Sequence, residues 1–213
     1  MAPTPRPRLF LDIDGVINAP HPPWLSTTTF TVTDNQGAGY AVNYTITVAP
    51  AMVAEIDQLR ADFDLELTIV STWLENPAIV SDLTKALGAL HRPRLLAIPP
   101  RKLGGYRSSL WKREAVLEDL SQNPPSAFVW IDDDETPVQG NFVRRAYDLP
   151  ALMIGPDPEH GLTAGDLAAI RSLLEGLRST RRHCRAQPGL EYEVLARSSV
   201  REPWRSVTGG DSP

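Results

Sequence analysis

The most constraining feature of this sequence is the run Leu9–Asn18, in which a short apolar segment ends in two carboxylates. An apolar run of this length predicts a buried strand, and the acids at its end predict that it delivers them to the edge of a sheet. Because side chains alternate along a strand, we expect Asp12 and Asp14 to point the same way, and Gly15 allows a sharp turn directly after them. Two carboxylates held this close repel each other unless one keeps its proton or a cation lies between them.

Strands and helices alternate along the rest of the chain, each with apolar residues at its typical spacing. We expect strands at 65–70, 94–98, 126–131 and 151–154, and helices at 50–63, 77–88, 109–120 and 164–177. Thr163 and Asp166 have the spacing of a capping arrangement at the start of the last helix. This alternation predicts an α/β fold, a doubly wound parallel sheet covered by helices on both faces. Such sheets bind ligands at the carboxyl ends of their strands, where Asp12 and Asp14 lie.

The segment 27–49 has the pattern of a β-hairpin, because apolar and polar residues alternate on both sides of the turn residues 35–39. Two interpretations stay open. The hairpin extends the edge of the main sheet, or it forms a small flap over the acids. A flap of this size would leave the site fairly open.

A second apolar strand, Phe128–Ile131, also ends in clustered acids, Asp132–Glu135. Two strands that deliver carboxylates to the same edge favour a magnesium site over an exposed acidic turn. The strand that ends at Val70 brings hydroxyl groups to this edge, from Ser71 and Thr72. The chain between this strand and Phe128–Ile131 also contains Lys112 and Lys102, and a lysine is a mobile charge suited to offsetting carboxylate negativity.

The order of these parts, Asp-x-Asp-Gly, a hydroxyl at a strand end, a lysine and Asp-Asp, resembles the motifs of the haloacid dehalogenase (HAD) superfamily. Most members are magnesium-dependent phosphatases with a Rossmann-like core, and the resemblance spans roughly residues 9–177. It implies hydrolysis of a phosphate monoester through an aspartyl-phosphate, with Mg²⁺ as cofactor. Asp12 would attack phosphorus, Asp14 would serve as acid and then base, and Ser71 and Lys112 would hold the phosphoryl oxygens.

The resemblance also implies a set of metal ligands and substrate contacts. The ligands would be Asp12, the backbone carbonyl of Asp14, and Asp133, while Asp132 would orient Lys112 or exchange roles with Asp133. The candidate substrate-binding residues are Gly15, Thr72 and Trp73. Basic residues between the second and third motifs are expected to help attract an anionic substrate: Arg92, Arg94, Arg101, Lys102 and Arg107.

A narrower resemblance comes from Ser71-x-Trp73, Trp130–Asp133 and His160–Thr163, which look like the HAD branch found in multidomain RNA-repair proteins. It implies a phosphorylated small molecule or a nucleic-acid end as substrate, with no obligate protein partner. The alternative is a catalytically silent HAD-like module that binds metal, nucleotide or a protein, which the intact acids of the first motif argue against. A phosphotransferase would have the same motifs as a phosphatase and would differ only in the acceptor of the phosphoryl group.

Composition narrows the class of protein further. The net charge of -5 provides no global attraction to nucleic acid or to an anionic membrane. The single cysteine, Cys184, excludes an intramolecular disulfide, and we find neither a signal-peptide pattern nor an apolar run of membrane-crossing length, which predicts a cytoplasmic protein. We expect a phosphatase core at 1–183 and a partly disordered tail at 184–213, where periodicity is lost.

Overall fold

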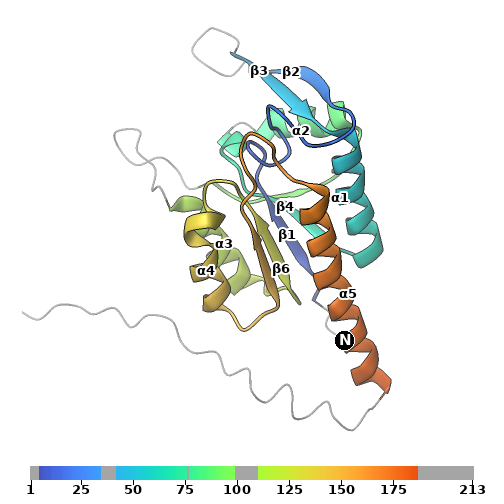
Figure 1. Ribbon diagram of the computed structural model, residues 1–213. Coiled ribbons are helices and arrows are strands. Elements are labelled where there is room, and N and C mark those ends of the chain that lie inside the picture. Colours follow the sequence, from blue (N-terminus) through green and yellow to red (C-terminus); the bar gives the residue numbers. More distant parts are fainter. Residues whose placement is uncertain (1–4, 35–41, 76, 99–109, 187–213) are drawn as a thin grey trace, which may run out of the picture. The chain divides into compact units, whose positions relative to one another are not determined.

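The computed structural model describes residues 5–34, 42–75, 77–98 and 110–186 (Figure 1). The chain divides into two compact units, Met1–Gly176 and Leu177–Pro213. All the described strands, and the acids of the predicted site, belong to the first unit. Most of the tail predicted at 184–213 lies outside the described residues.

Local sequence signals account for where several elements begin and end. Pro50 begins the first helix, where a missing backbone N–H costs nothing, and Asp64 ends it in the left-handed conformation. Hydrogen bonds between Thr163 and Asp166 confirm the predicted capping arrangement. In chain order the elements are β1 (Arg8–Leu11), β2 (Thr28–Asp34), β3 (Val42–Val48), α1 (Pro50–Phe63), β4 (Glu66–Ile69), the 3₁₀ helix η1 (Thr72–Glu75), α2 (Pro77–Leu87), β5 (Arg94–Leu95), α3 (Trp111–Gln122), β6 (Phe128–Ile131), α4 (Thr136–Ala146), β7 (Ala151–Ile154) and α5 (Ala164–Ala186).

The main sheet has five parallel strands in the order β5-β4-β1-β6-β7. The central strand β1 pairs with β4 on one side and with β6 on the other, so that Leu11 lies opposite both Ile69 and Ile131. The chain builds one half of the sheet outward from β1, then crosses over and builds the other half. The winding therefore reverses between β1 and β6, which is where ligands bind in folds of this kind. The predicted doubly wound α/β fold is confirmed.

Helices cover both faces of this sheet. Figure 1 shows α3 and α4 together on one face, and α1 with the first part of α5 on the other. On the first face, Phe10, Phe128 and Trp130 of the strands pack with Val116 of α3 and Val143 of α4. Both β1 and β6 are buried along their whole length, as expected for strands covered on both faces. Such a core holds the strand ends, and the acids next to them, in fixed positions.

Three elements differ from the prediction. The strand expected at 94–98 is only β5, Arg94–Leu95, and neither the helix α4 nor the 3₁₀ helix η1 was expected. The pattern of α4 misleads because its apolar Val138 and Phe142 are exposed, whereas the small Gly140 is buried. A Cβ at Gly140 would lie 3.1 Å from Cβ of Met153. The buried face of α4 therefore carries a glycine here because the helix packs closely on β7.

The hairpin β2–β3 forms a two-stranded antiparallel sheet of its own. The interpretation that it extends the main sheet is therefore wrong. Its inner face is apolar and buried at Val32, Ile46 and Val48. Figure 1 shows the hairpin at the end of the sheet where β1 ends, which is also where α1 begins. Among the described helices, none has both the length and the apolar character needed to cross a membrane.

Candidate active site

Three neighbouring strands end level with one another at the point where the winding reverses. The backbone N–H of Asp12 donates to the carbonyl of Ile131 at 3.0 Å, and the N–H of Val70 donates to the carbonyl of Leu11 at 2.9 Å. Asp12, Ser71 and Asp132 lie just beyond the ends of these strands. Residues far apart in the chain thus meet at one edge because the parallel strands are in register.

Lys112, in the first turn of α3, lies between the two central carboxylates. Its Nζ contacts Oδ2 of Asp12 and donates to Oδ2 of Asp132 at 2.9 Å. Asp12 is 5% exposed, Asp132 0% and Lys112 8%. The remaining carboxylate oxygens are also engaged: Oδ1 of Asp12 accepts the N–H of Ile13 at 2.7 Å, and Oδ1 of Asp132 accepts the N–H of Glu135 at 2.8 Å. These contacts fix both carboxylates in position.

Burial dominates the electrostatics of this cluster. It raises the pKa of Asp12 to about 7, a rise that Lys112 opposes and Asp132 reinforces. Burial alone would lower the pKa of Lys112, but the charges and hydrogen bonds of Asp12 and Asp132 together raise it above its ordinary value. Burial, and then the charge of Asp132, also raise the pKa values of Asp133 and Glu135. One lysine cannot neutralise these acids, so the cluster has an excess of negative charge that a cation would offset.

The donor set fits a hard divalent cation. Asp12, Asp132 and Asp133 can each bring one carboxylate oxygen to within 4.8 Å of the others, and oxygen ligands are those that Mg²⁺ prefers. Gly15 makes room for this arrangement: its φ is +65°, and a Cβ there would lie 2.3 Å from Cγ of Asp133. The predicted ligands Asp12, Asp132 and Asp133 are therefore brought together, with the predicted Gly15 packed against them.

Asp14 does not belong to this group of three acids. Because β1 ends at Leu11, strand alternation does not extend to Asp14, and the two carboxylates of the first motif differ in burial: Asp12 is buried and Asp14 is exposed. The side chain of Asp14 is exposed and accepts hydrogen bonds from Nδ2 of Asn18 at 2.7 Å and from Nε1 of Trp73 at 2.6 Å. Its backbone carbonyl as a metal ligand stays a prediction. Asn18 was not among the predicted site residues, although it belongs to the first motif.

The structure distinguishes between the alternative hydroxyl groups. Ser71 is 1% exposed and its hydroxyl lies near enough to Asp12 to lower the pKa of that carboxyl slightly, whereas Thr72 is exposed and begins η1. Ser71 is therefore the hydroxyl that the fold brings to the acids. Of the two lysines, Lys112 lies in the cluster, and Lys102 lies outside the described residues.

Arg94 does not face the candidate site. Its guanidinium pairs with Asp119 at 2.5 Å and with Glu66 at 3.1 Å, and it also donates to the hydroxyl of Thr68. The expectation that Arg94 attracts an anionic substrate is wrong, because its donors are engaged within the fold. Arg92 is exposed, and the other basic residues of that set, Arg101, Lys102 and Arg107, lie outside the described residues.

The third stretch of the narrower resemblance, His160–Thr163, packs against the loop after β1. The N–H of Leu162 donates to the carbonyl of Val16 at 2.9 Å, and Nε1 of Trp24 donates to the carbonyl of Leu162 at 2.8 Å.

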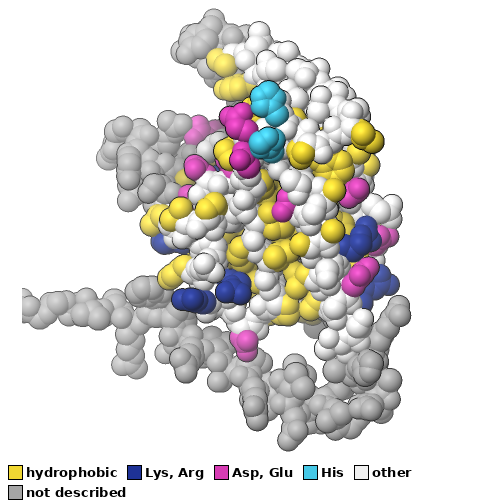
Figure 2. Space-filling model, in the orientation of Figure 1, with side chains coloured by type: hydrophobic (Ala, Val, Ile, Leu, Met, Phe, Trp, Pro, Cys, Tyr) yellow, Lys and Arg dark blue, Asp and Glu magenta, His cyan; other side chains and the backbone are white. Residues whose placement is uncertain are grey.

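On the face shown in Figure 2, histidine and acidic side chains lie next to each other near the hairpin. Among the described residues, the three-acid group around Asp12 is nevertheless the one with metal-binding geometry.

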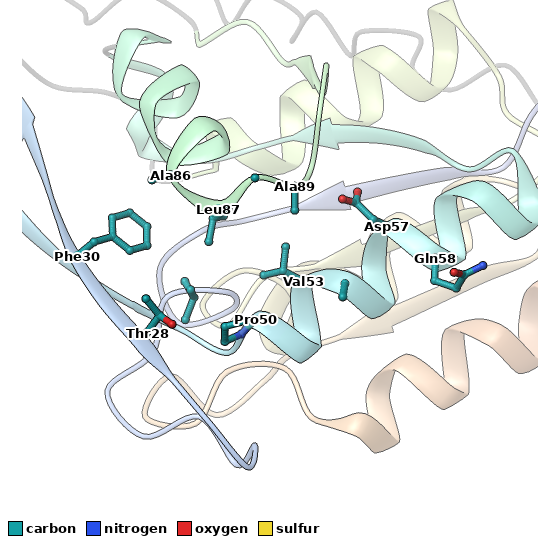
Figure 3. A pocket seen from close by; sticks show the side chains of 12 residues that line it. Thr28, Phe30, Pro50, Val53, Asp57, Gln58, Ala86, Leu87 and Ala89 are labelled. Carbon is teal, nitrogen blue, oxygen red and sulfur yellow. The ribbon is translucent and has the colours of Figure 1, made fainter.

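A cavity of about 500 Å³ lies away from the acids, between the hairpin, α1 and the end of α2 (Figure 3). Its lining is mainly apolar and includes Phe30, Val53 and Leu87. The carboxylate of Asp57, which also lines it, accepts the N–H of Leu90 and pairs with Arg60. Since no acid of the cluster lines this cavity and its one carboxylate is engaged, we assign the candidate site to the acids.

Fold and site together define a HAD-like α/β protein. The family model for the HAD domain in Swiss Army Knife RNA repair proteins matches residues 8–167, well over half of the chain, and the chain belongs to this family. The match runs from β1 into α5, so it includes every residue of the acidic cluster and the hairpin. Comparisons with curated proteins and with solved structures found no match. Both resemblances read from the sequence motifs are thereby confirmed.

Proposed function

We propose that this protein is a magnesium-dependent phosphomonoester hydrolase that forms an aspartyl-phosphate on Asp12. The observation that supports it most directly is the position of Asp12, held against Lys112 in a group of three carboxylates at the carboxyl edge of the sheet. Membership in a HAD family agrees with this chemistry.

In the first half of the reaction, a carboxylate oxygen of Asp12 attacks phosphorus and the bond from phosphorus to the leaving oxygen breaks. Asp14 donates a proton to that oxygen, and the product leaves as an alcohol. Lys112 and Ser71 hold the phosphoryl oxygens as charge builds on them. When bound to Asp12, Asp132 or Asp133 and the backbone carbonyl of Asp14, Mg²⁺ would offset the repulsion between carboxylate and phosphate.

In the second half, a water molecule attacks the phosphorus of the aspartyl-phosphate while Asp14 takes its proton. The bond between phosphorus and the Asp12 oxygen breaks, inorganic phosphate forms, and both carboxyl groups return to their starting states. For substrates we propose nucleotides or phosphorylated nucleic-acid ends. The family's description as part of RNA repair proteins supports this choice, as does the small size of the inserted hairpin, which would leave room for a large substrate.

The test is phosphate release from an aryl phosphate, a mononucleotide and a 3′-phosphorylated oligonucleotide, with magnesium or with a chelator. Asp12→Asn is compared with Asp134→Asn, which makes the same change at a neighbouring acid outside the cluster. We expect turnover that requires magnesium, persists in Asp134→Asn and falls by about 10³ or more in Asp12→Asn. A folded wild-type protein that binds magnesium and releases no phosphate would instead indicate a binding module.

A further inference from the structure

The carboxylate of Asp14 is exposed, yet both of its oxygens are held. Asn18 donates from Nδ2 to Oδ1 at 2.7 Å, and Trp73 donates from Nε1 to Oδ2 at 2.6 Å. An exposed aspartate without such contacts samples several rotamers, and ordering it costs free energy. These two bonds therefore select one orientation of Asp14 before substrate binds.

The chemistry of the two partners determines where a proton on Asp14 can go. The backbone N–H of Thr47 donates to Oδ1 of Asn18 at 2.9 Å, so the amide of Asn18 must turn its NH₂ group toward Asp14. An indole N–H, like that NH₂ group, only donates. Neither partner can accept a proton from Asp14, so a proton on Asp14 is not taken up by them and stays available for transfer to the leaving oxygen.

Both hydrogen-bond donors to Asp14, Asn18 and Trp73, contact the same strand of the hairpin, β3. Thr47 of β3 holds Asn18, and its carbonyl also accepts the N–H of Ala19 at 3.2 Å. Tyr44 of β3 packs on the indole of Trp73, with ring centroids 5.3 Å apart at an angle of 48°. The hairpin is thus connected to Asp14 through one hydrogen-bonded and one aromatic contact.

We propose that Asn18 and Trp73 are positioning residues that hold Asp14 in the orientation for protonating the leaving group, and that the hairpin sets their place through Thr47 and Tyr44. This inference rests on the proposed phosphatase function and adds to it a structural role for the hairpin. It assigns to the side chains of Asn18 and Trp73 an effect on one half-reaction, leaving-group departure.

The experiment compares two phosphomonoesters that differ in their need for an acid. An alkyl phosphate, such as glycerol phosphate, must have its leaving oxygen protonated, whereas 4-nitrophenyl phosphate releases a stable anion. The parameter is kcat/KM, which covers the steps up to formation of the aspartyl-phosphate. The variants are Trp73→Phe, which keeps a ring against Tyr44 but removes the N–H, and Asn18→Asp, which keeps the acceptor for Thr47 but replaces the donor to Asp14.

Asn43→Asp is the matched control. It makes the same chemical change on the hairpin, where Asn43 Oδ1 accepts the hydroxyl of Thr33 away from Asp14. We expect Trp73→Phe and Asn18→Asp each to lower kcat/KM for glycerol phosphate by about tenfold or more, and for 4-nitrophenyl phosphate by less than about threefold. Asn43→Asp should change neither value.

An equal loss on both substrates, or no loss on either, would overturn the inference and leave the phosphatase function standing. If wild type with magnesium releases no phosphate from these two substrates, nor from the mononucleotide and the 3′-phosphorylated oligonucleotide, the proposed function falls and the inference falls with it. Thermal unfolding of each variant checks the fold. Should Asn18→Asp fail to fold, Trp73→Phe alone decides, because it removes one N–H and keeps the aromatic packing.

Discussion

Gly15 shows how one missing side chain shapes the candidate metal site. Its φ is +65°, and a Cβ at this position would lie only 2.3 Å from Cγ of Asp133, so alanine here must displace that carboxylate. We expect Gly15→Ala to lower magnesium affinity by about tenfold or more, measured by isothermal titration calorimetry. The left-handed backbone conformation should also cost about 1–2 kcal/mol of stability.

Gly88→Ala provides the matched control for that prediction. Gly88 has a similar φ of +60°, but a Cβ there would meet nothing within 4 Å. It should cost a comparable stability, measured by urea unfolding, and leave magnesium affinity unchanged. Equal affinities for the two variants would show that Gly15 does not make room for a metal ligand.

Lys112 lies between two buried carboxylates, so its removal should be costly. We expect Lys112→Met to destabilise the protein by about 3 kcal/mol at neutral pH, because Asp12 and Asp132 then face each other uncompensated. Without the lysine, the pKa of Asp12 should rise further, so the loss should shrink as the pH falls and Asp12 takes up a proton. Urea unfolding at several pH values measures this, and a loss independent of pH would contradict it.

At the scale of elements, a buried ionic network ties the amino ends of the strands to α3. Arg8 of β1 pairs with Glu66 of β4 at 2.9 Å and with Asp119 of α3 at 2.7 Å, and Arg94 of β5 pairs with the same two acids. Asp119 is 5% exposed, and its hydrogen bond and charge raise the pKa of Arg94. The network lies at the opposite edge of the sheet from the candidate site.

Removing the charge of Asp119 should therefore affect stability and leave the site alone. We expect Asp119→Asn to cost about 3–5 kcal/mol in urea unfolding, because two arginines lose a shared buried partner, with kcat/KM unchanged. Asp64→Asn, which breaks the exposed pair with Arg6, should cost less than about 1 kcal/mol. Similar losses for the two variants would argue against a stabilising network.

At the scale of the whole molecule, magnesium binding and folding should both depend on pH. The pKa of Asp12 is about 7 in the folded protein, above its ordinary 3.8, so its contribution favours folding at low pH and is lost as the pH rises toward 7. Magnesium bound at Asp12 would compete with that proton, and it would bind only the folded state, in which the three acids are brought together.

We therefore expect saturating magnesium to raise the melting temperature little at about pH 5 and by several degrees at about pH 8, as measured by calorimetry. Asp12→Asn has no proton to lose at this position, so magnesium should raise its melting temperature only slightly at both pH values. An increase in wild type that is the same at both would mean that the proton on Asp12 does not compete with the metal.

The sequence alone was enough to predict the α/β class, most of the strands and the strand ends at which Asp12, Ser71 and Asp132 lie. These are local properties: apolar periodicity marks a buried strand, and a change to acids or hydroxyl groups marks its end. The order of the motifs also indicated the family. The sequence alone could not decide whether Ser71 or Thr72 supplies the hydroxyl of the site, because a shift of one residue along the strand changes which side chain faces the site.

The tertiary structure decided what depends on contacts between distant parts of the chain. It showed that Asp12 is buried while Asp14 is exposed, identified Asn18 and Trp73 as the partners of Asp14, and placed the hairpin outside the main sheet. It also revealed α4, whose buried face includes Gly140 because the helix packs closely on β7. Hydrophobic periodicity indicates which face of an element is buried. It does not indicate which side chains of different elements contact each other, and the site consists of such contacts.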